Sequence, residues 1–369
     1  MKTSNRLYID VHVLQTVPPS CINRDDTGSP KTAVYGGATR SRVSSQSWKK
    51  AMRDMFRDIF PEEELGLRTK RIVGMVADEI KGLEFAGNPE DTAQKILTTA
   101  GLKIKSTEKG TDALFFMSTA QARALAKLAY EDPETIKEKP SKNAKESAQH
   151  ALKQSPAIDV ALFGRMVADD PALNTDACAQ VAHSISTHKV SNEYDYFTAV
   201  DDLSPEDNAG AGHIGTVEFN SSTLYRYATV AVHELHKQLE GDPSEAVCGF
   251  VRAFLCSMPT GKQNTFANRT LPDAVLVTLR TDQPINLVGA FERPVRAGKN
   301  SDEGYLSASA KAFVEHTKKV YKNWLGEPEF SLVTGELLSE LGEVQPLQKL
   351  LDTLSGELRN RLKNGGEER

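Results

Sequence analysis

The sequence predicts an α+β fold, and three stretches carry that prediction. Residues 7 to 13 alternate apolar and polar side chains, which is the period of a half-buried strand. Segments between residues 61 and 131 are rich in Ala, Leu, Glu and Lys at helical spacing. Tyr196 to Val200 and Ile214 to Phe219 favour β structure on either side of a polar tip, which indicates a long-tipped hairpin.

A loop and a helix follow the first strand. Residues 16 to 37 contain three prolines and three glycines, so we expect a long surface loop there. Ser44 or Ser45 can cap the next helix. Apolar residues then recur at the spacing of one buried helical stripe, at Trp48, Met52, Met55 and Phe56.

The basic stretch, from Arg24 to Arg57, differs in charge from the rest of the chain. It holds eight basic and three acidic residues, a local charge of +5, whereas the chain of 369 residues has a formal net charge of −5. Lys49 and Arg53 lie one helical turn apart beside Lys50, and like charges so placed repel one another unless an anion joins them. This pattern favours a polyanionic partner, but a solvated basic helix face would explain it equally well.

The turn before this helix has the composition of a phosphate-binding loop. Gly36 and Gly37 precede Arg40 and Arg42 among small polar residues, and glycine lets backbone N–H groups approach phosphate oxygens closely. A plain turn is the alternative. Neither GxxxxGK[ST] nor GxGxxG is present, so no nucleotide cofactor is expected.

The middle of the chain is predicted to be mainly helical, with helices over 68 to 81, 91 to 99 and 118 to 131. The lysine arm follows, and we define it as Lys137, Lys139, Lys142 and Lys145. A solvated linker and an arm that follows phosphates are both compatible with it. The run DVALFGRM, from Asp159, is either strand-like or a short apolar run. Further on, we expect strands at 274 to 280, 284 to 292 and 332 to 333, and helices at 309 to 325 and 344 to 362.

Several classes of protein are disfavoured by the residues that the sequence lacks. The four cysteines are far apart without a CxxC pair, so neither a disulfide framework nor a zinc ribbon is expected, and a reducing cytoplasm fits. No histidine pair has metal-ligand spacing, so we expect no metal. No apolar run approaches the roughly 20 residues that cross a bilayer, so no membrane partner is expected. The first residues lead into a strand pattern without the features of a signal peptide.

Four stretches of the sequence carry a resemblance to a known family. They are IDVHVLQTVPPSCINRDDTGSPKTAVYGG, SRVSSQSWKKAMR, the GRM at Gly164 to Met166, and HKVSNEYDYFTAVDDL with the later HIGTVEF and YRYA. Together they resemble the CasC family, the backbone subunit that binds CRISPR RNA in the type I-E Cascade surveillance complex. The resemblance spans residue 7 to about residue 230 and continues more weakly to the C-terminus.

The resemblance implies a hand-like architecture. The palm would be a modified RRM-like, ferredoxin-type sheet formed by residues 1–60 and 181–369. Residues 61–180 would form helical fingers, and residues 195–218 a β-hairpin thumb. Several copies would assemble along one guide RNA.

The resemblance also implies contacts, residue by residue. Contacts to the RNA backbone fall on Arg24, Lys31, Ser44, Gln46, Lys49, Lys50 and Arg53. Arg40 and Arg42 join them from the basic stretch, and Arg165 joins them from the GRM motif. Met166, Thr198 and Ile214 match positions where fingers and thumb of adjacent copies meet a displaced nucleotide, with Ile214 in place of an expected leucine. The lysine arm matches an element that touches target DNA, although Pro140 interrupts it here.

We therefore expect a non-enzymatic cytoplasmic protein without cofactors, whose partners are CRISPR RNA, target DNA, further copies of itself and other Cascade subunits. The guide would be held by phosphate and sugar contacts while base pairing reads sequence. The alternative is a metal-dependent nuclease or CRISPR RNA-processing enzyme that uses Asp201, Asp202, His213 or His188. A standalone single-strand binding module is a third possibility, but the sequence shows no exposed aromatic platform of the kind such modules use.

Overall fold

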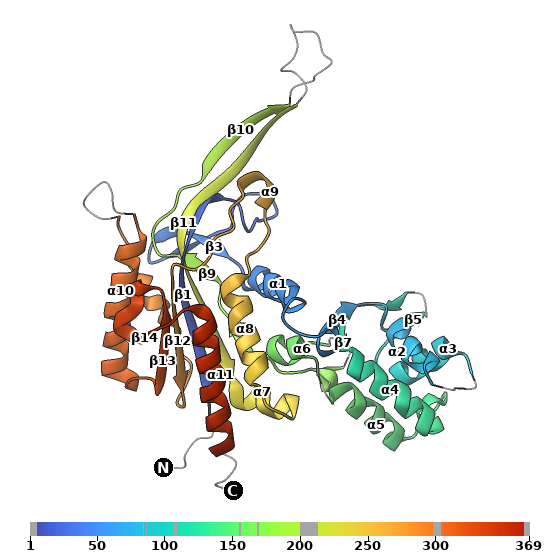
Figure 1. The fold of residues 1–369 in the computed structure, drawn as a ribbon. Helices are drawn as coiled ribbons and strands as arrows, with labels where there is room; N and C mark the ends of the chain where they lie inside the picture. Colours follow the sequence, from blue (N-terminus) through green and yellow to red (C-terminus); the bar gives the residue numbers. More distant parts are fainter. Residues whose placement is uncertain are drawn as a thin grey trace. The chain divides into compact units, whose positions relative to one another are not determined.

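A computed structural model describes residues 6–83, 85, 87–106, 109–154, 156–167, 170–199, 213–297 and 304–364. The chain divides into two compact units. Unit 1 comprises Met1–Asp54, Val181–Thr229 and Phe250–Asn360, and unit 2 comprises Met55–Gln180, Val230–Gly249 and Arg361–Arg369. The predicted α+β class is confirmed, because a large mixed sheet and many helices are present (Figure 1).

The large sheet has the strand order β14-β13-β12-β1-β11-β9-β3-β2. Its longest strands are β1 (Tyr8–Ser20) and β11 (His213–Ala231), which lie side by side. β1 pairs antiparallel with β12 (Ala274–Arg280), from Tyr8 opposite Arg280 to Leu14 opposite Ala274. The outer strands are β13 (Phe330–Thr334), β14 (Glu343–Val344), β9 (Ser184–Ser186), β3 (Ala38–Val43) and β2 (Thr32–Tyr35), and β8 (Ala179–Val181) also pairs with β11.

The first strand is confirmed, but it is longer and more deeply buried than the alternation predicts. Asp10 and His12, on the face expected to be wet, are each only 1% exposed. They are tolerated because Tyr227 donates a hydrogen bond to Asp10 and Tyr225 bonds to His12, both at 2.9 Å. The expected loop of residues 16 to 37 is also partly wrong, since β1 continues to Ser20 and β2 forms a hairpin with β3.

Helices cover the sheet of unit 1. The helix α10 (Leu306–Val320) continues into a π-helical turn, η6 (Tyr321–Leu325), and packs with η5 (Leu287–Phe291) on the sheet (Figure 1). Its Phe313 stacks on Phe291, with ring centroids 6.3 Å apart. The strand predicted for 284 to 292 is therefore wrong, because that segment forms the 3-10 turn η5. The last helix, α11 (Leu347–Asn364), buries a leucine stripe, and η7 (Glu336–Leu341) and α9 (Gln263–Phe266) are short turns.

Unit 2 is mainly helical, and its predicted helices are confirmed. They are α2 (Ile72–Lys81), α3 (Pro89–Thr99) and α4 (Thr119–Glu131), which share a core with α5 (Lys142–Lys153). The strand-like run from Asp159 is instead the helix α6 (Ile158–Phe163), so that prediction is wrong. The remaining elements are α7 (Val232–Leu239), the strand pairs β4 (Gly66–Thr69) with β7 (Phe115–Ser118) and β5 (Ile104–Ser106) with β6 (Gly110–Thr111), and the turns η1 (Glu62–Glu64), η2 (Pro133–Ile136) and η3 (Pro171–Leu173). The helix α8 (Ser244–Cys256) belongs to both units.

The predicted hairpin is confirmed as an antiparallel pair. β10 (Glu193–Ala199) pairs with the start of β11, from Glu193 opposite Phe219 to Ala199 opposite His213. The two strands extend away from the large sheet (Figure 1). The tip, with Asp201 and Asp202, lies outside the described residues. None of the helices in the described ranges has the length and apolar character that a bilayer crossing requires.

Candidate nucleic-acid interface

The loop before β2 is folded by its own polar side chains. One carboxylate oxygen of Asp25 accepts hydrogen bonds from the Thr27 hydroxyl at 2.7 Å and from the backbone N–H groups of Thr27 and Ser29 at 2.9 and 3.0 Å. The Thr27 hydroxyl bond, above all, lowers the pKa of Asp25. Asn23 accepts from the backbone N–H of Ser44 at 2.8 Å. The loop that carries Arg24 is thereby fixed against the start of α1.

The helix α1 (Ser45–Phe56) begins and packs as predicted. The Ser44 hydroxyl accepts from the backbone N–H of Ser47 at 3.3 Å, which is the N-cap interaction. Trp48 and Met52 are fully buried, whereas Met55 is only partly buried. Ser44 is itself 6% exposed, so its hydroxyl serves the helix first.

The charged residues of α1 have different environments. Lys50 is exposed and forms an ion pair with Asp54, its Nζ lying 2.6 Å from Oδ2. Lys49 and Arg53 are half-buried, and burial lowers the pKa of Lys49. Gln46 is exposed in the first turn.

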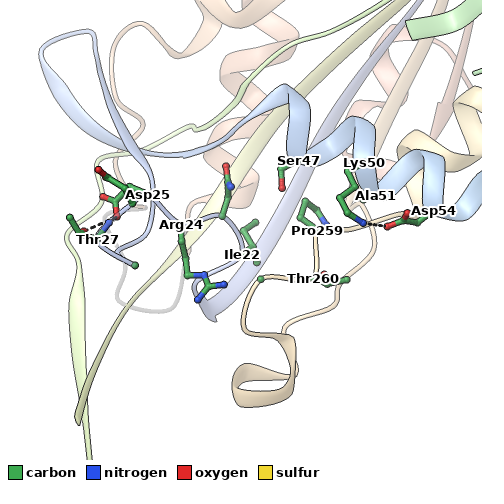
Figure 2. A pocket seen from close by; sticks show the side chains of 14 residues that line it. Ile22, Arg24, Asp25, Thr27, Ser47, Lys50, Ala51, Asp54, Pro259 and Thr260 are labelled. Atoms are coloured by element: carbon green, nitrogen blue, oxygen red, sulfur yellow. Dashed lines mark hydrogen bonds and ion pairs between the residues drawn. The ribbon is translucent and has the colours of Figure 1, made fainter. Parts of the chain in front are cut away.

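An open groove of about 530 Å³, the α1 groove, lies between the loop and the helix. It is lined by residues 22 to 28 and by the α1 residues Ser47, Lys50, Ala51 and Asp54. Pro259, Thr260 and Gly261, from a segment more than two hundred residues later, also line it (Figure 2). Arg24, Lys50 and several hydroxyl groups are therefore gathered around one space, together with three carboxylates.

Two of the predicted contact residues are instead buried structural arginines. Arg40 is 0% exposed and donates to the backbone carbonyls of Ser186 and Phe291, both at 2.8 Å. Arg165 is 5% exposed and donates to the carbonyls of Phe116 and Leu152 at 3.0 and 3.1 Å. Burial lowers the pKa of Arg165 to about 10. Both guanidinium groups are buried and bonded to backbone carbonyls, so neither is presented to a polyanion at the candidate interface.

Arg42 and Lys31 lie beside the hairpin of β2 and β3. Arg42 is half-buried and donates to the Thr32 carbonyl at 3.2 Å, and its guanidinium lies 3.1 Å from Nδ1 of His183. Burial, followed by the charges of Arg42 and Lys31, lowers the pKa of His183. The neutral imidazole can therefore accept a hydrogen bond from Arg42.

A family model described as CT1975-like protein matches residues 9–355. The chain belongs to the CT1975-like family. A solved chain described as "CRISPR RNA-guided surveillance complex, pre-nicking" is 32% identical, with a TM-score of 0.77, and the match covers 95% of this chain and 100% of that chain. Another, described as "CRISPR RNA-guided surveillance complex", is 28% identical with a TM-score of 0.60, over 95% and 99% of the two chains. A search of curated proteins found no match.

These matches confirm the resemblance to Cascade subunits that the sequence predicts. The apolar and neutral residues predicted from that resemblance are not among the residues that line the α1 groove. In this CT1975-like chain Met166 is 84% exposed, in unit 2. Thr198 is exposed on β10 and lies opposite Ile214, whose side chain is outside the described part of the structure.

The hairpin also carries exposed aromatic residues that the sequence analysis did not predict. Tyr194 and Tyr196 are 67% and 62% exposed, and they share a face because neighbouring side chains alternate along a strand. Phe197 points to the other face, where its ring lies over Gly215. The alternation in EYDYF was the signal, and the expectation of no exposed aromatic platform was wrong.

The lysine arm of the CT1975-like chain is exposed throughout. Lys137 pairs with Glu134, and Lys142 lies 3.7 Å from Glu146. Pro140 precedes Ser141, whose hydroxyl caps α5 by accepting from Ala144 at 3.2 Å. The proline therefore lies before the start of α5 and does not interrupt the helix. An open depression of about 420 Å³ is lined by Lys137 and Lys145, together with Asp91, Gln94, Lys95, Thr98, Thr99, Glu138 and Pro140.

Of the four residues of the alternative, enzymatic hypothesis, the structure describes only the side chain of His188. Among the described residues, no group of three or more His, Cys, Asp or Glu could hold a metal ion. His188 uses both ring nitrogens, with Nδ1 2.9 Å from the Lys189 carbonyl and Nε2 accepting from Thr223 at 3.1 Å. Its ring stacks on Tyr305, with centroids 3.6 Å apart, so its environment is that of a structural residue.

Proposed function

We propose that this chain is a non-catalytic backbone subunit that binds the guide RNA of a CRISPR surveillance complex. The observation that carries the proposal is the α1 groove, where Arg24 and Lys50 come together on a chain of net negative charge. The similar chains belong to RNA-guided surveillance complexes. Phosphate contacts through Arg24, Lys31, Lys49, Lys50 and Arg53 would hold the guide without reading its sequence.

The division of the molecule fits this proposal. Unit 1 would be the RRM-like palm, unit 2 would contain the fingers, and the hairpin of β10 and β11 would be the thumb. Thr198 and Ile214 would contact a displaced nucleotide between copies of the chain, as would Met166, since unstacking a base needs an apolar or neutral wedge. The lysine arm would contact target DNA paired with the guide. Other subunits of the complex would join this assembly.

Charge reversal on α1 tests the proposal. We expect the triple variant Lys49→Glu, Lys50→Glu and Arg53→Glu to lose guide RNA during co-purification with the complex, because cations that release counterions become repulsive anions. The matched control, Lys311→Glu, Lys319→Glu and Lys322→Glu, makes the same charge change at exposed positions of α10 and η6. It should retain RNA.

Retention of RNA by a folded α1 variant, at the level of the α10 control, would sink the proposal. Circular dichroism and thermal unfolding establish that both variants are folded. The proposed absence of catalytic activity is tested by incubating purified wild-type protein with guide RNA and Mg²⁺ or Mn²⁺. We expect intact RNA, and cleavage that depends on the metal would favour a nuclease.

A further inference from the structure

The segment Pro259–Gly261, which lines the α1 groove, lies unusually close to the loop that carries Arg24. Pro259, Thr260 and Gly261 line the groove together with Lys50 and Arg24, and Figure 2 shows Pro259 and Thr260 between those two cations. A Cβ on Gly261 would lie 2.3 Å from the Ile22 carbonyl oxygen and 2.7 Å from that of Cys21. Such distances are far below van der Waals contact, so only glycine lets this segment lie so close to the loop that carries Arg24.

The same segment holds two non-glycine residues in a disfavoured conformation. Lys262 (φ 47°, ψ 28°) and Ala267 (φ 45°, ψ 40°) are both left-handed, and they flank the short helix α9 (Figure 1). Among the described non-glycine residues, Glu240 is the one other with positive φ. Strained residues of this kind persist where the surroundings enforce them, and they concentrate at ligand-binding positions.

The surroundings of α9 do enforce the conformation. Phe266 packs on Phe219 of β11, with ring centroids 5.7 Å apart. The Thr270 hydroxyl donates to the Thr16 carbonyl at 2.9 Å, and Gln15 donates to the Thr270 carbonyl at 3.0 Å. The segment is therefore anchored to both long strands of the sheet, which makes it a rigid wall.

Lys262 brings a further positive charge to this place. Burial raises the pKa of the Cys21 thiol, while Arg24 and Lys262 act in the opposite direction, so both cations lie near the same sulfur atom. No ion pair involves Lys262 within the part of the chain that the structure describes, in contrast to Lys50 with Asp54. Its charge is thus available to a ligand.

We propose that the segment Pro259–Ala267 is the second wall of the RNA groove and that Lys262 binds a phosphate of the guide strand. This rests on the function proposed above. Lys262 directly follows the groove-lining Gly261 and lies near Cys21 together with Arg24, so it adds a cation at this edge of the groove. Thr260, exposed on the same wall, supplies a hydroxyl for a phosphate or a ribose.

Replacing Lys262 by glycine separates this role from a structural one. Glycine adopts the left-handed conformation without strain, so Lys262→Gly should raise Tm by roughly 1 to 3 °C. The same change should weaken RNA binding about 3- to 10-fold at 0.15 M salt, and reduce the slope of log K against log salt by about 0.7, the value for one phosphate contact on a single strand. Lys262→Asn, uncharged and tolerant of this conformation, should behave alike, and Lys262→Arg should restore binding.

Ala267→Gly is the matched control, because it relieves strain at the other end of α9 and keeps the charge. It should bind RNA within about 2-fold of wild type with an unchanged salt slope. Wild-type affinity and slope in folded Lys262→Gly and Lys262→Asn would overturn the inference and leave the proposed function standing. Equal losses in Lys262→Gly and Ala267→Gly, at unchanged slope, would overturn it too, since the wall would then act only by its rigidity. If wild-type protein itself retains no guide RNA, the proposed function fails and the inference fails with it.

Discussion

The basic stretch of unit 1 and the lysine arm of unit 2 look alike as sequence, but their cations do different things. In the basic stretch, Arg40 is buried and donates to backbone carbonyls, and Arg42 contacts Thr32 and His183, whereas Lys50 is exposed and forms a local ion pair with Asp54. In the lysine arm every cation is exposed, and the ion pairs are local ones to Glu134 and Glu146. Local charge in a sequence therefore counts cations, whereas burial and pairing decide how many are left for a ligand.

The largest expected effect is the loss of protein stability when the buried Arg40 is replaced. Arg40→Met removes the donor to two backbone carbonyls at 2.8 Å and leaves them buried without a partner. The free energy of unfolding should fall by about 3 to 5 kcal/mol. Arg24→Met, at an exposed position of the same stretch, should change it by less than about 0.5 kcal/mol. Urea unfolding measures both, and equal losses would contradict the distinction between buried and exposed arginines.

The second effect concerns the lysine arm. Replacing its four lysines by alanine should weaken pairing of the guide-loaded complex with target DNA about 10-fold or more, because charge contacts to phosphates are lost. Guide retention should stay unchanged. Four other exposed lysines of unit 2 provide the control, namely Lys70, Lys81, Lys105 and Lys127. If both sets of variants weaken DNA binding alike, the arm has no specific role. Gel-shift titrations at two salt concentrations distinguish these results.

A smaller effect is expected at the ion pair in the groove. Asp54 holds Lys50 where a phosphate would bind, so Asp54→Asn should tighten RNA binding about 2- to 5-fold, the range of an exposed ion pair. Asp58→Asn, an equal charge change at an exposed position that does not line the groove, is the control. A gain of the same size in both variants would show that only net charge matters.

The smallest expected effect is a change in the pKa of His183. Burial and Arg42 hold the pKa of His183 below its usual value of about 6.5. As pH falls, this histidine therefore takes up a proton in the unfolded chain before it does so in the folded protein. Below about pH 6.5, His183 thus slightly lowers the free energy of unfolding. A phosphate nearby favours the imidazolium ion. We expect the pKa of His183, followed by NMR, to rise when RNA binds, and an unchanged value would place the RNA away from β3.

The sequence predicted what depends on local pattern. The stripe of Trp48, Met52 and Phe56 specified α1, and the alternation around Tyr196 specified the hairpin. It failed where the environment is set by distant segments. Arg40 reads as a surface cation, but Ser186 and Phe291 arrive from other parts of the chain to bury it. The strand predicted for 284 to 292 failed likewise, since Leu287 and Phe291 pack under α10 as a 3-10 turn.

Half of the candidate site was accessible to sequence reasoning. The loop and helix that carry Arg24 and Lys50 are contiguous, so their charge was visible as one stretch. The second wall lies more than two hundred residues away, and its signature is a backbone conformation at Lys262 and Ala267 that side-chain patterns do not reveal. The resemblance to CasC could not supply it either, because it named contacts only in the motifs that it matched.

The continuity of β11 has a mechanical consequence. One strand of 19 residues, roughly 60 Å long, pairs with β10 in the hairpin and then runs on beside β1 in the middle of the sheet. No loop separates these two parts, so the hairpin has no hinge at its base. The hairpin can therefore move only by bending along its length. A force on its free end is transmitted through β11 to the hydrogen bonds of the central strands.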